Sequence, residues 1–383
     1  MYESDNFPNE ITLLSLFNAY FDCRRHKRNT LNALDFEFDF ERKILELYND
    51  LKNKTYSIGS NICFVITDPK PREVWAADFR DRIVHHLVYN AVKDRFHNRF
   101  IRDTFSCIPE RGTLAACKRL NHFTRSITQN YTKKAYYLKA DISNFFLSID
   151  KNILFQELKR YVHEEWLLNL LHQIIFHDPR FNVIIKSKPE LFKVLPTHKS
   201  LWNTPNHKGL PIGNLTSQFF SNVYLNILDQ YVKHGLKCKY YCRYVDDFVI
   251  LHEYPKQLNE WYDAIDNFLQ TRLKQKLHPH KKAVNTIFSG IDFVGYAVKP
   301  NRIYIRQRTI KRAFKVVSRW KNNSDKFNQS FLKRMRATIN SYLGMLQNVN
   351  GYNLRKSICC KIFTLFIHPD KNFSKLILVL KFS

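Results

Sequence analysis

The sequence YYLKADISNFF occupies residues 136–146, and KYYCRYVDDFVIL occupies residues 239–251. Each is an apolar run of strand length that carries aspartate, with Asp141 in the first and Asp246 and Asp247 in the second. The first run predicts a buried strand leading into a helix. The second predicts two strands joined by a tight turn, at the centre of a sheet. Carboxylates are costly in such apolar surroundings unless a cation or another partner compensates them.

The paired aspartates have two interpretations. Aspartate is common in turns, so Asp246 and Asp247 could simply close a β-hairpin. Alternatively, the acids of both segments could hold Mg²⁺, which prefers oxygen ligands; two such ions about 3.5–4 Å apart suit phosphoryl transfer. The two segments alone leave both interpretations open.

Charge points to a polyanionic partner. The 383 residues include 61 Lys and Arg against 34 Asp and Glu, a formal net charge of +27. Nucleic acid is the first candidate for such a chain, and a generically basic surface is the alternative. The hydrophobic content of 44% allows a sizeable core, and the length suggests two or three lobes.

Cysteine spacing and the N-terminal sequence indicate the redox state and the cellular compartment to be expected. The eight cysteines form no CxxC pair and no zinc-finger array, so we expect reduced thiols and no structural zinc. Acidic Glu3, Asp5 and Glu10 stand where a signal peptide would be basic, and the apolar stretch 11–17 is too short to span a bilayer. We therefore expect a cytoplasmic protein with no membrane partner.

The stretch 299–336 is strongly basic. Its only acid is Asp325, and Ile310 and Val317 belong to an apolar stripe with helical spacing. The basic residues are Lys299, Arg302, Arg306, Arg308, Lys311, Arg312, Lys315, Arg319, Lys321, Lys326, Lys333, Arg334 and Arg336. The pattern predicts a basic amphipathic helix that could follow the phosphates of a nucleic-acid duplex or bind an acidic accessory subunit.

Seven segments, in collinear order, resemble the motifs of reverse transcriptases. YVDD resembles the family's signature tetrapeptide, and ADISNFF resembles its first metal-binding motif. The other five are KPREVWAADFRDRIVHH (70–86), DTFSCIPERGTLAA (103–116), GLPIGNLTSQFFSNVYLN (209–226), LHPHKKAV (277–284) and FVGY (293–296). The resemblance covers about residues 60–300, and a thumb is expected after it.

Three strings resemble one branch of the family, the diversity-generating retroelement enzymes and related bacterial antiphage-defence reverse transcriptases of the unknown groups. They are GNLTSQ (213–218), CIPERGTLAA (107–116) and SYLGMLQNVNGYNLRK (341–356), with a departure at Glu110. This resemblance implies a bacterial or phage-encoded protein with a structured non-coding RNA template. It also implies a small accessory protein, or alternatively a homo-oligomer.

The resemblance implies a right-hand polymerase of the α+β class. Fingers would occupy residues 1–135, a palm with an antiparallel sheet backed by helices 136–300, and a basic helical thumb 301–383. The implied activity is RNA-directed DNA synthesis: dNTPs are added to the 3′-hydroxyl of an RNA–DNA duplex with two Mg²⁺ ions, or Mn²⁺ in their place. The alternative is a catalytically idle RNA-binding scaffold of a ribonucleoprotein.

The resemblance also implies roles at the chemical centre. Asp141 and Asp246 would bridge both metals, the carbonyl of Ile142 would complete a site, and Asp247 would be the more dispensable carboxylate. Phe146 would be the steric gate that excludes a 2′-hydroxyl, although it could equally be a core residue.

Basic residues would bind the triphosphate and protonate the leaving pyrophosphate. Lys70, Arg72 and Arg80 lie in the expected fingers motif and would hold its oxygens, although each alone could be a solvated surface charge. Lys282, or else Lys281, could donate a proton to the leaving pyrophosphate.

One predicted turn would face the nascent base pair. It consists of Pro211, Ile212 and Gly213, and an apolar Ile212 suggests low fidelity. Gln218 could contact the template, support the turn or cap the helix that follows.

Overall fold

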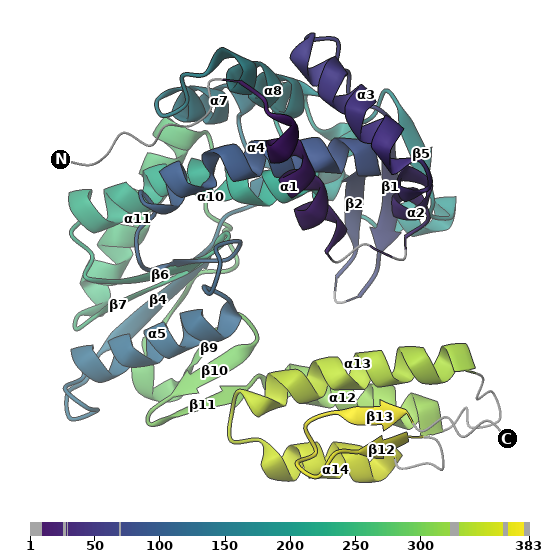
Figure 1. Ribbon diagram of the computed structural model, residues 1–383. Helices are drawn as coiled ribbons and strands as arrows, with labels where there is room; N and C mark the ends of the chain where they lie inside the picture. Colours follow the sequence, from purple (N-terminus) through teal and green to yellow (C-terminus); the bar gives the residue numbers. More distant parts are fainter. Residues whose placement is uncertain are drawn as a thin grey trace, which may run out of the picture.

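The computed structural model describes residues 10–25, 28, 30–68, 70–321, 329–362 and 367–378. Three regions follow one another along a curve (Figure 1). The first is a large helical region with a small sheet, the second is built on a five-stranded sheet, and the third is a smaller region of helices. Mixed helices and strands confirm the α+β class.

The five-stranded central sheet has the strand order β3-β6-β7-β4-β8. These strands are β3 (Thr104–Phe105), β4 (Tyr136–Asp141), β6 (Tyr240–Tyr244), β7 (Asp247–His252) and β8 (Ala283–Thr286). The short β3 pairs with β6 in parallel, and the other pairs are antiparallel. The expected antiparallel sheet is thus present, with one parallel edge strand.

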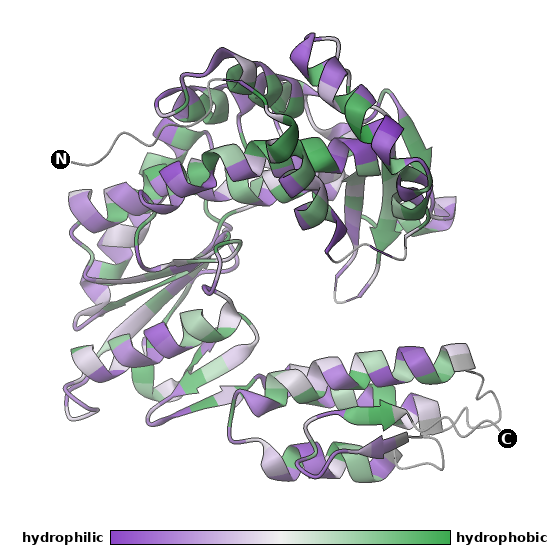
Figure 2. Ribbon diagram, in the orientation of Figure 1, coloured by the Kyte–Doolittle hydropathy of each residue, from purple (hydrophilic) through white to green (hydrophobic). Residues whose placement is uncertain are grey.

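Long helices build the first region and flank the central sheet. They are α1 (Leu13–Arg24), α2 (Leu31–Phe38), α3 (Phe40–Lys52), α4 (Phe79–His97), α5 (Thr113–Ile127), α7 (Lys151–Lys159), α8 (Glu165–Phe176), α10 (Leu215–Gln230) and α11 (Pro255–Leu273). Shorter ones are α6 (Phe145–Ser148), α9 (Pro189–Lys193), η1 (Thr197–Lys199), η2 (Leu201–Asn203), η3 (Tyr231–Gly235) and η4 (Ile287–Ser289). Hydrophobic residues dominate α1 and α8, whereas the helices of the third region mix both kinds (Figure 2).

Both faces of the central sheet are buried. Tyr241 and its cross-strand partner Ile250 belong to the core that includes α10 and α11. The next pair, Cys242 and Val249, belongs to a second core that includes α5. Because side chains alternate between faces, a strand covered on both sides has a continuous apolar sequence. This explains the unbroken run in 239–251.

Sequence boundaries do not follow the spatial regions. β3 and α5 precede residue 135, yet β3 is a strand of the central sheet and α5 packs on it. Conversely, β5 (Val183–Ile185) pairs in parallel with β1 (Asn61–Ile66) in the first region, where β2 (Arg72–Ala77) completes a sheet of order β2-β1-β5. A boundary at 135 therefore separates residues that pack together.

The stretch 299–336 is not one helix. Its first residues close the sheet of β9 (Ile291–Phe293), β10 (Tyr296–Lys299) and β11 (Arg302–Ile305), with a turn in which Asn301 has a φ of +61°. Ile303 and Ile305 alternate with polar residues, which suits a strand rather than a helix. The prediction of a helix beginning at 299 was therefore wrong.

Helices follow this small sheet. They are α12 (Gln307–Lys321), α13 (Gln329–Gln347) and α14 (Tyr352–Ile362), with a two-stranded sheet of β12 (Ile367–Pro369) and β13 (Leu376–Leu378) beside them. Lys326, one of the basic residues counted in this stretch, lies outside the described residues. Across the described ranges, no helix combines the length and the apolar character needed to cross a bilayer.

A buried ion pair lies beneath the hairpin that joins β6 to β7. Arg243 and Asp229 are both fully buried, and the guanidinium donates two hydrogen bonds to the carboxylate, at 2.7 and 2.6 Å. Tyr241 and Thr104 donate two more to the same carboxylate. The Arg243 Nη1 atom also donates to the carbonyl of Val245, at 2.8 Å, and so supports the turn from below.

Removing one partner of this pair should destabilise the protein strongly, because a buried charge is left uncompensated. We expect Asp229→Asn to lower the free energy of unfolding by about 3–5 kcal/mol, measured by denaturant titration. A double variant, Asp229→Leu with Arg243→Met, removes both charges. Its loss in free energy of unfolding should be smaller than the sum of the losses of the single variants Asp229→Leu and Arg243→Met. A loss below about 1 kcal/mol for Asp229→Asn would contradict this account, since that is the range of exposed pairs.

Candidate active site at the edge of the central sheet

Three carboxylates meet at one edge of the central sheet. Asp141 is the last residue of β4 and lies directly opposite Asp247, the first residue of β7. Asp246 occupies the turn before β7, and its carbonyl accepts a hydrogen bond from the backbone N–H of Ile142 at 3.2 Å. Pairing of β4 with β7 therefore brings together acids that are far apart in the sequence.

The turn itself has an unusual backbone. Val245 has a φ of +56°, a conformation that β-branched residues rarely adopt. Such a residue costs about 1–3 kcal/mol and persists only where its surroundings enforce it. The hydrogen bond from Arg243 to the Val245 carbonyl supplies part of that enforcement.

The carboxylates perturb one another. Burial, and then the negative charges of Asp141 and Asp247, raise the pKa of Asp246 to about 7. Burial also raises the pKa of Asp247, which Lys139 opposes and Asp141 reinforces. Perturbed carboxylates of this kind are typical of functional sites.

Two ammonium groups compensate the acids in part. Lys281 Nζ lies 2.6 Å from Asp141 Oδ1, and Lys139 Nζ lies 3.5 Å from Asp247 Oδ2. Within the described residues, no group of three or more His, Cys, Asp or Glu side chains is gathered as a metal centre. Each ammonium group offsets part of the negative charge of the carboxylate that it faces.

Of the two neighbouring lysines, the structure brings Lys281 to the carboxylates. The ammonium of Lys282 lies 4.1 Å from the ring centroid of Tyr262, on α11. This geometry does not support Lys282 as the proton donor and favours the alternative residue.

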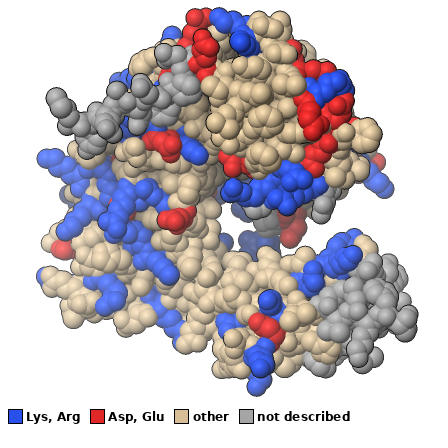
Figure 3. Space-filling view, in the orientation of Figure 1, with Lys and Arg blue, Asp and Glu red and all other residues tan. Residues whose placement is uncertain are grey.

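The predicted triphosphate ligands divide into two groups. Lys70 is exposed, and its pKa is lowered by partial burial and by the positive charges of Lys281 and Lys199, while Asp141 opposes the shift. Arg72 is also exposed, and its charge contributes to the same lowering. Lys and Arg side chains line the lower edge of the first region, facing the hollow above the third (Figure 3). Lys70 therefore lies within electrostatic reach of Asp141, and Arg72 within electrostatic reach of Lys70.

Arg80 has a different environment. Its Nη2 atom lies 2.6 Å from Asp50 Oδ2, and its guanidinium lies 5.0 Å from the ring centroid of Tyr56. These contacts hold α4 to the end of α3. The geometry gives Arg80 a structural role and does not support the prediction that it holds a triphosphate.

The turn 211–213 is fixed to strand β2. The carbonyl of Ile212 accepts a hydrogen bond from the N–H of Trp75 at 2.7 Å. Gly213 has a φ of +141°, and a Cβ there would lie 2.6 Å from the Trp75 carbonyl oxygen, so only glycine fits. Pro211 and Ile212 are half-buried on this support.

Gln218 lies on the exposed side of α10. Its Oε1 atom accepts a hydrogen bond from the thiol of Cys107 at 3.2 Å, which joins two of the segments quoted above. Asn214 is the N-cap residue of α10, so the capping interpretation of Gln218 is not supported. Contact with a template stays a prediction.

Phe146 is half-buried beside the fully packed Phe145, with ring centroids 5.2 Å apart. Its carbonyl accepts a hydrogen bond from Leu210 N at 2.9 Å, which places it next to the segment leading into the 211–213 turn. The side chain of Ile142 is buried, and its backbone forms an isolated antiparallel β-bridge with that of Leu277. The roles of Phe146 and of the Ile142 carbonyl stay predictions.

Sequence reasoning missed several residues of the site. Lys139 sits inside the quoted strand, and Arg243 directly precedes the YVDD tetrapeptide. A basic residue in an apolar strand signals a buried charge partner, so Arg243 was detectable. Lys199 carries no such signal, because it lies in a loop that matches none of the quoted segments.

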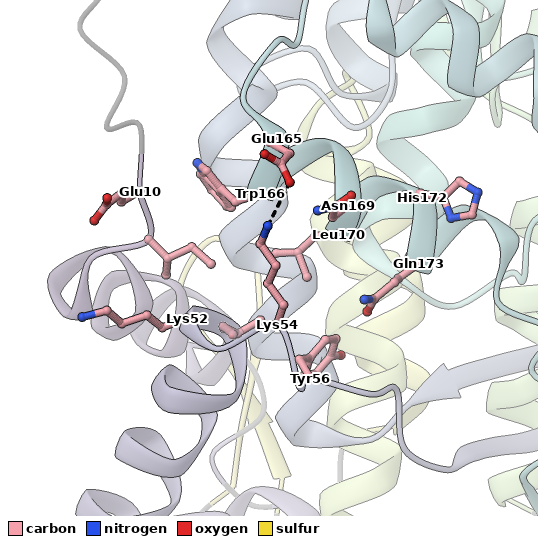
Figure 4. A pocket seen from close by; sticks show the side chains of 12 residues that line it. Glu10, Lys52, Lys54, Tyr56, Glu165, Trp166, Asn169, Leu170, His172 and Gln173 are labelled. Atoms are coloured by element: carbon pink, nitrogen blue, oxygen red, sulfur yellow. Dashed lines mark hydrogen bonds and ion pairs between the residues drawn. The ribbon is translucent and has the colours of Figure 1, made fainter.

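One large cavity lies away from this edge. A cavity of about 690 Å³ separates the end of α3 from α8, with Tyr56 and Trp166 in its wall and the Lys54–Glu165 ion pair, 2.8 Å long, in its lining (Figure 4). None of the three carboxylates lines it. The perturbed acids, and not this cavity, therefore define the candidate site.

The chain is similar to several known proteins. The chain is 22% identical to the protein YkfC of Escherichia coli strain K12 over 286 residues, which are 65% of this chain and 67% of YkfC. A truncated apo telomerase from Candida tropicalis aligns with a TM-score of 0.47 and 11% identity, covering 65% of this chain. Telomerase from Candida albicans, solved with a fragment of telomeric RNA, aligns with a TM-score of 0.47 and 10% identity, covering 81% of this chain. The alignments span 55% and 61% of the two telomerase chains.

Residues 68–298, well over half of the chain, match the family described as reverse transcriptase (RNA-dependent DNA polymerase). The matched span begins just before β2, contains all three carboxylates and ends within β10. Its enzyme class is RNA-directed DNA polymerase, and its fold is that of a right-hand polymerase. The chain belongs to the reverse transcriptase family.

Proposed function

We propose that this chain copies RNA into DNA by adding dNTPs to a 3′-hydroxyl at the edge formed by Asp141, Asp246 and Asp247. The observation that carries the proposal is the pairing of Asp141 at the end of β4 with Asp247 at the start of β7, beside Asp246 in the adjoining turn, whose pKa is raised to about 7. A protein that only bound RNA would gain nothing from crowding three acids beside a polyanionic ligand.

Reverse transcriptases generally depend on divalent metal ions, and the residues present here fit such ions. All the donors are oxygens, which suits Mg²⁺ and also admits Mn²⁺. Two of the carboxylates already face cations, because Lys281 pairs with Asp141 and Lys139 pairs with Asp247. We assign Asp141, Asp246, Asp247 and the Ile142 carbonyl as the ligands. When bound, two Mg²⁺ ions neutralise the developing charge and activate the 3′-hydroxyl.

The chain's own residues then position the substrates. Lys70 and Arg72 would bind the triphosphate, because both are exposed, Lys70 lies within electrostatic reach of Asp141, and Arg72 lies within reach of Lys70. Lys281 would pass a proton to the pyrophosphate as it leaves. The 211–213 turn would support the nascent base pair, and Gln218 would contact the template strand.

The template proposed is a dedicated structured non-coding RNA, in a retroelement or an antiphage-defence system of a bacterium or phage. The motif resemblances at 107–116, 213–218 and 341–356 support this choice, and the net charge of +27 suits an RNA partner. Sequencing the RNA that co-purifies with the protein tests it. A single enriched structured transcript is expected, whereas a random sample of cellular RNA would contradict a dedicated template.

Neutralising Asp246 should abolish DNA synthesis without unfolding the protein. Metal coordination contributes several kcal/mol to phosphoryl transfer, so Asp246→Asn should reduce dNTP incorporation by roughly a hundredfold or more. Incorporation near the wild-type rate would contradict the assignment of the site.

The pH dependence of stability provides the control. Because the pKa of Asp246 is raised in the folded state, ionising it costs stability as pH rises from about 4 to about 7. In EDTA at pH 8, Asp246→Asn should therefore match or exceed the wild-type melting temperature, and that advantage should disappear near pH 4.

Opening the space at Phe146 should weaken sugar selection. If its ring excludes a 2′-hydroxyl, Phe146→Ala should raise the ratio of rNTP to dNTP incorporation by roughly tenfold or more. Phe145→Ala is the matched control: it creates a core cavity that lowers stability and leaves the ratio unchanged. An unchanged ratio in Phe146→Ala would assign Phe146 to the core.

The neighbouring lysines provide a second matched pair. A general acid contributes about 10²–10⁴-fold, so Lys281→Ala should lower kcat by about that factor and remove the alkaline decline of the pH–rate profile. Lys282→Ala should stay near wild type, since its ammonium faces Tyr262. Equal losses in the two variants would show that the residues contribute only general positive charge.

A further inference from the structure

Residues 177–208, between α8 and the 211–213 turn, form a surface that the proposed chemistry does not use. Its strand β5 is an edge strand of the sheet β2-β1-β5 and lies at the right of the first region in Figure 1. The segment contains α9, η1 and η2 in addition to β5.

Polar contacts fix this segment in place. Arg180 forms an ion pair with Asp178 at 2.6 Å and donates hydrogen bonds to the carbonyls of Leu201 and Thr204, at 3.3 and 2.9 Å. Ser187 Oγ accepts a hydrogen bond from the N–H of Val65, on β1, at 2.9 Å. The two ends of the segment are therefore held together and attached to the sheet.

The fixed segment exposes large apolar side chains. Phe181 is 85% exposed, Ile184 and Ile185 are 51% and 54% exposed, and Val194 is 56% exposed. Trp202 is 38% exposed, and its ring lies 5.2 Å from that of Trp75. Ile184 and Ile185 are neighbours in β5 and face opposite sides of the sheet, so only one of them shares a face with the other exposed groups. Large exposed apolar groups on a fixed segment are typical of a binding surface.

Charge decides which partner suits the surface. Residues 178–202 contain two acids, Glu190 and Asp178, of which Asp178 pairs with Arg180; the other bases are Lys186, Lys188, Lys193 and Lys199. Lysine is depleted in protein–protein interfaces. Lysines among exposed aromatic rings are typical instead of surfaces that bind single-stranded nucleic acid, where bases stack and phosphates meet cations.

One end of the segment is joined to the candidate site through β2. The ring centroid of Trp202 lies 5.2 Å from that of Trp75. The backbone N–H of Trp75 in turn donates a hydrogen bond to the carbonyl of Ile212 at 2.7 Å, in the turn proposed to support the nascent base pair. The surface is therefore attached, through Trp75, to the turn that the proposed function uses.

We propose that residues 178–202 bind the single-stranded RNA template before it reaches the active site. Bases stack on Phe181 and on the neighbouring aliphatic side chains, and Lys186, Lys188 and Lys193 bind the phosphates without reading sequence. This inference rests on the proposed function, because it names the path of the strand that the site copies.

The test compares two primer–templates that differ only in the RNA overhang, about 12 nucleotides against about two, so that only the longer one can cover the surface. Affinity is measured by fluorescence anisotropy with the full-length protein and without dNTPs. Phe181→Ser should weaken binding of the long overhang by roughly fivefold or more and leave the short one unchanged. Phe38→Ser is the matched control, since Phe38 is 94% exposed on α2, outside the segment.

Charge gives a second readout. Replacing Lys186, Lys188 and Lys193 with Gln should reduce the salt slope for the long overhang by about two, at roughly 0.7 per phosphate. Wild-type affinity and slope in both variants would overturn the proposal, and so would an equal loss on both overhangs. A variant that changes only its oligomeric state, measured as its mass in solution, and keeps wild-type RNA affinity would also overturn the proposal. That result would assign the surface to protein–protein contacts.

Failure of this inference can be told from failure of the proposed function. All these variants keep the carboxylates, so they should extend the primer on the short overhang at the wild-type rate, which supports a role confined to the template ahead of the site. A wild-type protein that extends neither substrate but shows the overhang-dependent difference in affinity would contradict polymerisation and still support the RNA surface.

Discussion

Mutual repulsion among three carboxylates is the constraint that the rest of the structure must overcome. Asp141 and Asp247 are opposite one another in the β4–β7 register, with Asp246 in the adjoining turn. Burial, reinforced by the charges of Asp141 and Asp247, raises the pKa of Asp246 and so records the cost of ionising it there. Apolar burial on both faces of the sheet opposes it, because β4 and β7 cannot separate without exposing two cores. The free energy gained by burying the two cores therefore offsets the cost of holding three carboxylates close together, an arrangement that suits a metal-dependent reaction.

Compensation of that charge is incomplete in a specific way. Lys281 pairs with Asp141, and Lys139 pairs with Asp247. Asp246 is the acid whose pKa rises furthest, since its burial adds to the charges of both neighbours. Lys281 is 41% exposed, so its ammonium can leave Asp141 when a stronger cation arrives. By contrast, the Arg243–Asp229 pair beneath the turn is fully buried and permanent.

Local patterns predicted the site far better than they predicted its surroundings. The run 239–251 indicated two strands and a turn, and the structure has β6 and β7 around Val245 and Asp246. By contrast, the basic stretch from 299 was read as a helix because charge density concealed the strand alternation of Ile303 and Ile305. Neighbouring Lys281 and Lys282 could not be separated, since their directions depend on the tertiary partners Asp141 and Tyr262. Arg80 lies in the expected motif, but its partner Asp50 comes from another helix, which no local pattern reveals.

The path of the chain explains why the fingers and the acids are coupled. After Asp141 the chain leaves the central sheet, contributes β5 to the first sheet, and returns through the turn at Ile212 before β6 begins. That turn is hydrogen-bonded to Trp75, while Leu210 is bonded to Phe146, so the excursion is joined to β2 and to the helix that follows Asp141. A displacement of β2 should therefore move the turn proposed to support the nascent base pair together with Phe146, the residue proposed to select the sugar. Contacts at the fingers can in this way adjust the geometry of the site without touching a carboxylate.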